Sequence, residues 1–274
     1  MGNGLEGQRI GFVGCGAMAR ALCGGLVGAG VPTESLRGSD PDAGQRAAFE
    51  GELGVATTTD NSELVASSDI VVLCVKPGLV ARVLRELPDG AGADKKLWIS
   101  IAAGVRIQGL EVVLGTDCRI VRVMPNTPAL VGEGASVLCP NTRASEADRA
   151  AAEAVFSAVG TTWEAPAEHL LDAVTGLSGS GPAYVFLFLE ALGDAGVRQG
   201  LPREAAYQLA FQTVAGAARL ALESGRHPAD LKDQVTSPGG TTIAGLEQLE
   251  AAGVRAAVYQ AVEAATRRSR ELGD

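Results

Sequence analysis

Hydroxyl side chains and glycines gather in one short stretch near the carboxyl end of the chain, Thr236-Ser237-Pro238-Gly239-Gly240-Thr241-Thr242-Ile243. These residues add little to an apolar core, but they can surround a small anion. Glycines let backbone N–H groups approach a ligand, and the free N–H groups at the start of a following helix attract negative charge. The stretch therefore predicts a site for a substrate carboxylate, although hydroxyl residues also cap helices routinely.

A second motif lies near the amino end, where the apolar run 10–13 passes into Gly14-Cys15-Gly16-Ala17-Met18-Ala19. Its order is strand, tight turn and helix, and its pattern is G-x-G-x-x-A, a variant of the dinucleotide-binding fingerprint. Gly14 would make the turn, Gly16 would let the backbone approach a pyrophosphate, and Ala19 would keep the helix close to the strand. The motif predicts a nucleotide site, and it favours a substrate site over a plain helix cap at the other end of the chain.

Three further segments follow expected strands: Val75-Lys76-Pro77, Ala102-Ala103-Gly104 and Met124-Pro125-Asn126-Thr127-Pro128. Dinucleotide folds bind their ligands at the carboxyl ends of strands. Lys76 could lie near a ribose or phosphate, or it could be an ordinary solvated loop residue. Asn126 is more simply explained as a group that orders the nicotinamide or a water than as part of an Asx-type turn.

The choice of nucleotide stays open. Asp40 stands where an acid usually binds the ribose hydroxyls and repels a 2′-phosphate. However, Ser39-Asp40-Pro41-Asp42 is also a good helix cap, and Ser39 and Arg46 could instead serve a phosphate. Both NADP(H) and NAD(H) are therefore candidates.

The elements that must position these residues alternate between strand and helix in the first half of the chain. Strands are expected at residues 10–13, 36–39, 55–57, 70–75, 97–101, 120–123 and 135–138. Helices are expected at residues 17–29, 42–52 (directly after Pro41), 61–67, 79–87, 107–114 and 146–158. Ser145 and Asp148 have the spacing of a capping box for the last helix. This alternation predicts an α/β fold with a doubly wound parallel sheet, a Rossmann domain, over residues 1–165.

From residue 166 onward the pattern indicates only helices, at 182–196, 203–224, 229–234, 241–252 and 254–272. The run Tyr184-Val185-Phe186-Leu187-Phe188-Leu189 is apolar nearly all round its helix, so it needs burial on every side. A half-chain of about 110 residues can hardly enclose such a helix. Residues 166–274 are therefore expected to form an all-helical dimerisation domain that also binds substrate. The alternative is a monomer with this helix wedged between its domains.

Composition excludes several classes of partner. The 274 residues carry a net charge of −9 with no basic run, which argues against nucleic acid. No apolar run reaches the ~18 residues of a membrane span, and residues 1–8 do not resemble a signal peptide. The five cysteines lack C-x-x-C spacing, and His169 and His227, each expected at a helix boundary, lack a ligand cluster. Reduced thiols, no metal site and a cytoplasmic location are expected.

Taken together, six segments resemble the pyrroline-5-carboxylate reductase family: residues 11–19, 75–77, 102–105, 124–128, 176–184 and 237–242. The resemblance covers essentially the whole chain, and its last two segments are the most specific. It implies reduction of the cyclic imine 1-pyrroline-5-carboxylate to L-proline by NAD(P)H, the last step of proline synthesis. It also implies an interlocked helical homodimer, often five such dimers in a ring, which makes a decamer.

The resemblance also implies residue roles. In the cofactor site, the first loop with Ser39 and Asn61 would hold the adenosine half, and residues on the nicotinamide ribose side would be Val75, Lys76, Pro77 and Ala102. Asp40 departs from relatives that strongly prefer NADPH, which often carry Arg, Ser or Thr there.

In the substrate site, Ser237 and the backbone of Gly240 and Thr241 would hold the carboxylate. Glu168 matches an acidic position near the pocket. The Thr242 hydroxyl would reach the imine nitrogen and orient it while a hydride goes to the imine carbon, so Thr242 is the expected catalytic residue and most of the catalysis would come from positioning.

Two other classes of protein fit parts of the sequence. A 2-hydroxyacid dehydrogenase would need a lysine acid/base in the helical half, but residues 176–184 contain none and Lys232 stands alone. A nucleotide-sensing dimer would keep the Gly14–Ala19 motif without needing the loop from Ser237 to Thr242.

Overall fold

The computed structural model describes residues 4–88 and 92–273. Its strands are β1 Ile10–Val13, β2 Leu36–Ser39, β3 Thr57–Thr58, β4 Ile70–Leu73, β5 Leu97–Ser100, β6 Arg119–Met124, β7 Gly134–Pro140 and β8 Gly160–Glu164. Its α-helices are α1 Ala17–Gly28, α2 Ala43–Leu53, α3 Asn61–Ser67, α4 Pro77–Arg85, α5 Ile107–Leu114, α6 Glu146–Ser157, α7 Leu170–Val174, α8 Gly181–Arg198, α9 Arg203–Ser224, α10 Pro228–Gln234, α11 Thr241–Ala251 and α12 Val254–Gly273. Short helical turns are η1 Thr33–Ser35, η2 Ala93–Lys95, η3 Thr127–Val131 and the π-helical η4 Thr175–Gly179.

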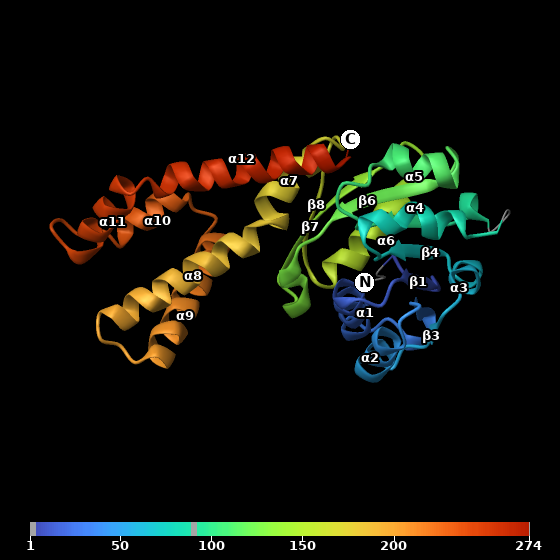
Figure 1. The fold of residues 1–274 in the computed structure, drawn as a ribbon, viewed down its shortest axis with the longest axis horizontal. Helices are drawn as coiled ribbons and strands as arrows, with labels where there is room; N and C mark the ends of the chain where they lie inside the picture. Colours follow the sequence, from blue (N-terminus) through green and yellow to red (C-terminus); the bar gives the residue numbers. More distant parts are fainter. Residues whose placement is uncertain (1–3, 89–91, 274) are drawn as a thin grey trace. The chain divides into compact units, whose positions relative to one another are not determined.

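The strands form one sheet in the order β3-β2-β1-β4-β5-β6-β7-β8 (Figure 1). The chain leaves β1 toward β2 and β3 on one side and returns to β4 on the other side of β1, so the strand order reverses between β1 and β4. This reversal is the place where doubly wound sheets bind ligands. The predicted Rossmann arrangement is confirmed.

Two features of the sheet differ from the expectation. β7 runs antiparallel to β6, because residues 125–133 between them are too few for a crossover, which takes about a dozen residues or more. The parallel edge strand β8 was not expected at all. Its side chains are largely exposed, Trp163 among them, so its sequence lacks the apolar alternation that marks a strand.

Apolar residues from the strands fill a core on each face of the sheet. Along β4, Ile70 and Val72 join one cluster, while Val71 and Leu73 join the other. The first cluster includes buried residues of α1, α2 and α6, and the second includes residues of α3, α4 and α5. β4 is buried on both faces, as its continuous apolar run predicts.

Helix ends follow local hydrogen bonds. The Ser145 and Asp148 side chains form the predicted capping box of α6. Asp42 caps α2 by accepting the Gln45 N–H (2.9 Å), so the helix begins at Ala43 and Pro41 lies outside it. His227 caps α10, where its Nδ1 accepts the Ala229 N–H (3.2 Å), and His169 precedes α7. Both histidines therefore lie at helix boundaries, as predicted.

The chain divides into two compact units. The first ends at Gly179 and includes the chain again from Ala264, and the second spans Ser180–Glu263. The boundary expected after residue 165 marks the end of the strands, whereas α7 and η4 pack within the first unit, with Leu171 fully buried in its core. The Ser269 hydroxyl, near the end of α12, donates to Asp172 (2.7 Å).

The second unit has almost no core within one chain. Among residues 180–263 only Gly193, Ala206 and Ala210 are buried. Large apolar side chains are exposed instead, including Phe186 at 63% and Leu187 at 68%. Exposed apolar surface on this scale indicates an interface. Separately, no helix among the described residues has the length and hydropathy that crossing a bilayer requires.

The β7–β8 pairing gives a stability test. Gly160 has φ +152°, and a Cβ there would overlap the backbone of Gly134. We expect Gly160→Ala to lower the free energy of unfolding by about 1–3 kcal/mol, measured by urea denaturation. The matched control is Gly51→Ala in α2, where a Cβ meets no atom within 4 Å. The control should be neutral or stabilising, and equal losses in both variants would contradict the explanation.

Candidate functional site

The turn after β1 places the glycine motif against the end of β4. Gly14 donates its N–H to Ser39 O (2.7 Å), and the Cys74 N–H donates to Val13 O (2.8 Å). Gly14 has φ +98°, and a Cβ there would lie 2.9 Å from Cys74 O. Any other residue would meet both backbone strain and a steric clash, so Gly14 has the turn-making role that the sequence predicts.

The second glycine of the motif faces open space. Gly16 is the N-cap of α1 with φ −69°, no side chain caps this end of the helix, and a Cβ at Gly16 would meet no protein atom within 4 Å. Protein packing therefore does not require a glycine here, whereas a ligand that approaches the backbone does. Ala17 is exposed, Met18 half-buried and Ala19 fully buried. The motif fits a pyrophosphate at the N-terminus of α1.

An acid and a thiol lie at the same loop. The Cys15 N–H donates to Asp40 Oδ2 (2.9 Å), and Asp40 follows β2 directly. Burial, together with the nearby Asp40 carboxylate, raises the pKa of the Cys15 thiol to about 12. Cys15 is thus a neutral packing residue at physiological pH, and all five cysteines are free thiols.

Ser39 and Asn61 form a pair behind this loop. Ser39 is fully buried, and its hydroxyl donates to Asn61 Oδ1 (2.5 Å), so it fixes the first residue of α3. Direct contact of either residue with the adenosine half of a nucleotide stays a prediction.

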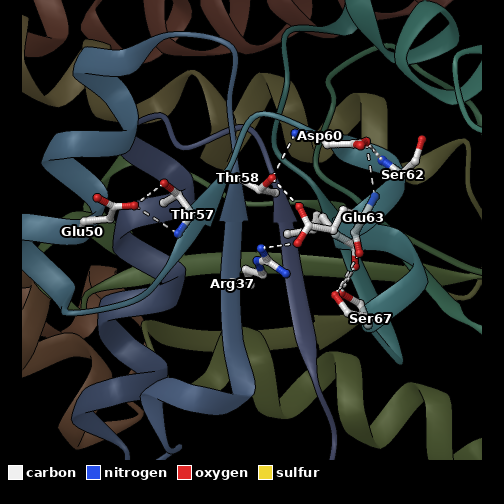
Figure 2. A network of polar contacts seen from close by, with 10 residues as sticks. Arg37, Glu50, Thr57, Thr58, Asp60, Ser62, Glu63 and Ser67 are labelled. Atoms are coloured by element: carbon white, nitrogen blue, oxygen red, sulfur yellow. Dashed lines mark hydrogen bonds and ion pairs between the residues drawn. The ribbon is translucent and has the colours of Figure 1, made fainter.

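Figure 2 shows polar contacts that attach α3 to β2 and β3. Glu63 of α3 accepts hydrogen bonds from Arg37 on β2 (2.7 Å) and from the Thr58 hydroxyl on β3 (2.7 Å). Asp60 caps the helix by accepting the Ser62 N–H (2.8 Å), and Glu50 of α2 accepts the Thr57 N–H (3.2 Å). These bonds hold the start of α3, where Asn61 lies.

The next strand ends carry the residues expected near the nicotinamide. Lys76 is the N-cap of α4 with an exposed side chain, and Pro77 is the first helical residue, a position that suits proline. The Val75 side chain lies beside the Gly14 turn, 3.2 Å from where a Cβ on Gly14 would be. Ala102 follows β5 and is buried. Their placement at strand ends was predicted, and their contacts with a cofactor remain predictions.

Asn126 has a structural role that the sequence does not reveal. Its Oδ1 accepts the Ala135 N–H (2.8 Å), and its Nδ2 donates to Ser178 O (3.1 Å). The side chain therefore joins the start of β7 to η4, which lies 52 positions away along the sequence. These bonds use one of the two N–H donors and one of the two acceptor lone pairs of the amide, and a direct contact of Asn126 with the nicotinamide stays a prediction.

Glu168 is held by a partner that sequence reasoning missed. Arg122, buried on β6, donates to Glu168 Oε1 (2.8 Å), which also accepts the Ile107 N–H (2.8 Å) at the start of α5. A carboxylate is favourable at a helix N-terminus. A charged residue inside the apolar strand β6 is the signal that could have pointed to Arg122. The predicted substrate contact of Glu168 is untested.

The hydroxyl-rich loop lies in the second unit and forms a tight turn into α11. Gly240 donates its N–H to Ser237 O (3.1 Å), with Pro238 and Gly239 (φ +65°) between them, as in a type II turn. A Cβ at Gly240 would overlap Ser237 Oγ, so the serine hydroxyl lies against the N-cap of the helix.

The start of α11 is left available to an anion. Gly240 caps the helix without a side-chain hydrogen bond, and the first bond of the helix is made by the Ala244 N–H. Thr241 is exposed and Thr242 is half-buried on the first turn. The alternative explanation, that the hydroxyl residues simply cap α11, is disfavoured because no hydroxyl of this loop makes a capping hydrogen bond.

The expected site residues fall in both units: the cofactor residues and Glu168 in the first, and the loop from Ser237 to Thr242 in the second. Within residues 4–88 and 92–273, no three His, Cys, Asp or Glu side chains group in a way that could hold a metal ion.

Comparison with known proteins gives two family matches. Residues 168–272 match the family described as pyrroline-5-carboxylate reductase dimerisation, and residues 9–104 match the NADP oxidoreductase, coenzyme F420-dependent family.

Full-length relatives agree with the first match. The pyrroline-5-carboxylate reductase of Methanosarcina acetivorans is 48% identical over 98% of this chain and 99% of its own. The structure of a pyrroline-5-carboxylate reductase from Coxiella burnetii superposes with a TM-score of 0.92 at 39% identity, covering 97% of this chain and 99% of that one. The Plasmodium falciparum pyrroline carboxylate reductase, solved with NADP bound, gives a TM-score of 0.88 at 37% identity, covering 98% and 99%. A likeness of this extent, together with the two loops described above, places the chain in the pyrroline-5-carboxylate reductase family.

Proposed function

We propose that this protein reduces 1-pyrroline-5-carboxylate to L-proline with NAD(P)H, the last step of proline biosynthesis. The uncapped N-terminus of α11, with Ser237 against Gly240, is the observation that carries the proposal, because it provides a place for a small carboxylate. Family membership supplies the reaction, and the open space at Gly16 supports the nucleotide site.

The cofactor would be held by the first unit. Its pyrophosphate fits above Gly16 at the start of α1, and the loop Gly14–Ala19 lies at the reversal of strand order. Ser39 and Asn61 would serve the adenosine half, and Val75, Lys76, Pro77, Ala102 and Asn126 the nicotinamide half. The reduced nicotinamide would supply a hydride to the imine carbon.

Residues of the loop would hold the substrate for that transfer. The Ser237 hydroxyl and the backbone N–H of Thr241 would bind the carboxylate, which fixes the ring. The Gly240 backbone, also predicted to hold it, donates its own N–H to Ser237 O (3.1 Å).

The Thr242 hydroxyl would hydrogen-bond the ring nitrogen. An iminium substrate already carries the proton on that nitrogen, so the hydride alone completes the amine. A neutral imine needs one proton as well, and because a threonine hydroxyl is not a useful acid, Thr242 would orient a water that delivers it. Glu168, which forms an ion pair with Arg122, would contribute an acidic group to substrate binding.

The second unit supports the dimer in this proposal. Within one chain its apolar helix faces are exposed, and residues 168–272 match a dimerisation family. We infer a homodimer in which a second copy of the chain covers α8. Five such dimers would form the decamer. We also propose a cytoplasmic location, which a biosynthetic role and five free thiols support.

The activity can be tested directly. Purified protein should oxidise NADH or NADPH in the presence of 1-pyrroline-5-carboxylate, with proline formed in equal amount, as followed at 340 nm and by amino-acid analysis. 2-Oxoacids, which 2-hydroxyacid dehydrogenases reduce with the same nucleotides, should give no turnover. Nucleotide binding without turnover of any substrate would instead favour the sensing dimer.

The two hydroxyls of the loop should differ in kinetics. Thr242→Ala should lower kcat/KM about ten-fold, as expected for one lost hydrogen bond to a nitrogen whose charge changes. Ser237→Ala should mainly raise KM, because a carboxylate is bound alike in the ground and transition states. Dissociation constants for the nucleotide should be unchanged in both. Wild-type kinetics for Thr242→Ala, or loss of nucleotide binding in Ser237→Ala, would contradict these roles.

The dimer can be tested with matched charge insertions. Phe186→Glu places a charge on the exposed apolar face of α8, and Val112→Glu does the same at an exposed valine of α5 in the first unit. We expect sedimentation at micromolar concentration to show at least a dimer for wild type and Val112→Glu, but monomer or unfolded protein for Phe186→Glu. A stable monomeric wild type would refute the inference.

A further inference from the structure

We propose that Asp40 makes the nucleotide site selective for NADH over NADPH. The inference rests on the proposed function, because it assumes that the first unit binds a nicotinamide nucleotide. It goes further by assigning the choice between the two nucleotides to one side chain.

The backbone of Asp40 is fixed at the carboxyl edge of the sheet. The residue follows β2, the strand next to β1, and its N–H donates to Thr58 O on β3 (3.2 Å). The contacts of α3 with β2 and β3 in Figure 2 hold this corner of the sheet. Asp40 therefore lies beside the glycine loop because of the strand pairing.

The carboxylate of Asp40 is also fixed, and it faces the loop. Oδ2 accepts the Cys15 N–H (2.9 Å), and Oδ1 accepts the Asp42 N–H (2.9 Å). Cys15 lies between the two glycines of the motif, so the carboxylate is tied to the peptide that would approach the pyrophosphate. An ionised carboxylate offers about four acceptor positions, and two of them are used here. The remaining lone pairs suit the hydroxyls of an adenosine ribose.

A 2′-phosphate at the same place would meet an unfavourable charge. It carries about two negative charges and would lie next to a carboxylate that backbone hydrogen bonds prevent from turning away. The ribose of NADH has a hydroxyl there instead, which donates to the carboxylate. The two nucleotides thus differ in the sign of their interaction with Asp40.

Two arginines near the loop are engaged elsewhere. Arg46 Nη1 donates to the carbonyls of Asp40 (2.8 Å) and Pro41 (3.1 Å), so it stabilises the turn that carries the carboxylate. Arg20 Nη1 donates to Cys15 O (3.1 Å) and Gln45 Oε1 (2.9 Å), and its Nε lies 3.3 Å from Glu52. A phosphate that recruited Arg20 would compete with Gln45 and Glu52, whereas Arg46 uses only Nη1 and keeps its charge beside Asp40.

The test compares two substitutions that remove the same charge two residues apart. Asp40→Asn keeps an oxygen for the Cys15 N–H but removes the negative charge. Asp42→Asn removes a charge from the exposed N-cap of α2, where asparagine caps equally well. Dissociation constants of NADH and NADPH would be measured by fluorescence titration at low and high salt, with thermal denaturation to confirm that both variants fold.

Wild type should bind NADH about ten-fold more tightly than NADPH at low salt, and screening should narrow the difference at high salt. Asp40→Asn should shift the NADPH-to-NADH affinity ratio about ten-fold toward NADPH, whereas Asp42→Asn should change it by less than about two-fold because it lies outside the ribose position. An unchanged ratio in Asp40→Asn, or a wild-type preference for NADPH, would overturn the proposal while leaving the reductase function intact. Failure of wild type to bind either nucleotide would overturn the proposed function as well.

Discussion

The close approach of the turn after β1 to the end of β4 is the constraint on which the nucleotide half of the protein depends. A left-handed backbone at Gly14 lets the loop pass Cys74 O at a distance that no side chain allows. That turn directs α1 so that its N-terminus faces open space at Gly16, and it brings the Cys15 N–H to Asp40. The proposed anion position at Gly16 and the proposed ribose acceptor Asp40 both depend on this turn.

The second unit, in contrast, is not organised around a core within one chain. Helices α8 and α9 pack closely, since a Cβ at Gly193 would lie 2.9 Å from the Tyr207 ring, yet their outer faces remain apolar and exposed. Its loop from Ser237 to Gly240 is held by a local turn and not by a core. Local geometry thus shapes this loop, whereas the exposed apolar faces of the helices around it can be buried only by association.

Local patterns in the sequence predict most of the elements and the placement of the two loops. The strand, turn and helix of the G-x-G-x-x-A motif and the capping box at Ser145 are predicted correctly because the residues that interact are neighbours in the sequence. Features that depend on distant partners are not predicted. The amide of Asn126 reaches Ser178, 52 positions on, and Arg122 pairs with Glu168, 46 positions on. β8 is missed because an exposed edge strand carries little apolar pattern.

The path of α12 has a consequence for how the protein is made. The helix starts in the second unit, but from Ala264 it belongs to the first. There Ser269 bonds to Asp172, and Leu272 packs against Gly104. Chains emerge from the ribosome amino end first, and domains generally fold as they appear. Here the first unit lacks the contacts of residues 264–273 until the whole second unit has been synthesised. The first unit is thus completed only after the helices of the second unit have been synthesised. A nascent chain arrested before residue 264 would expose the surface around Gly104 to chaperones.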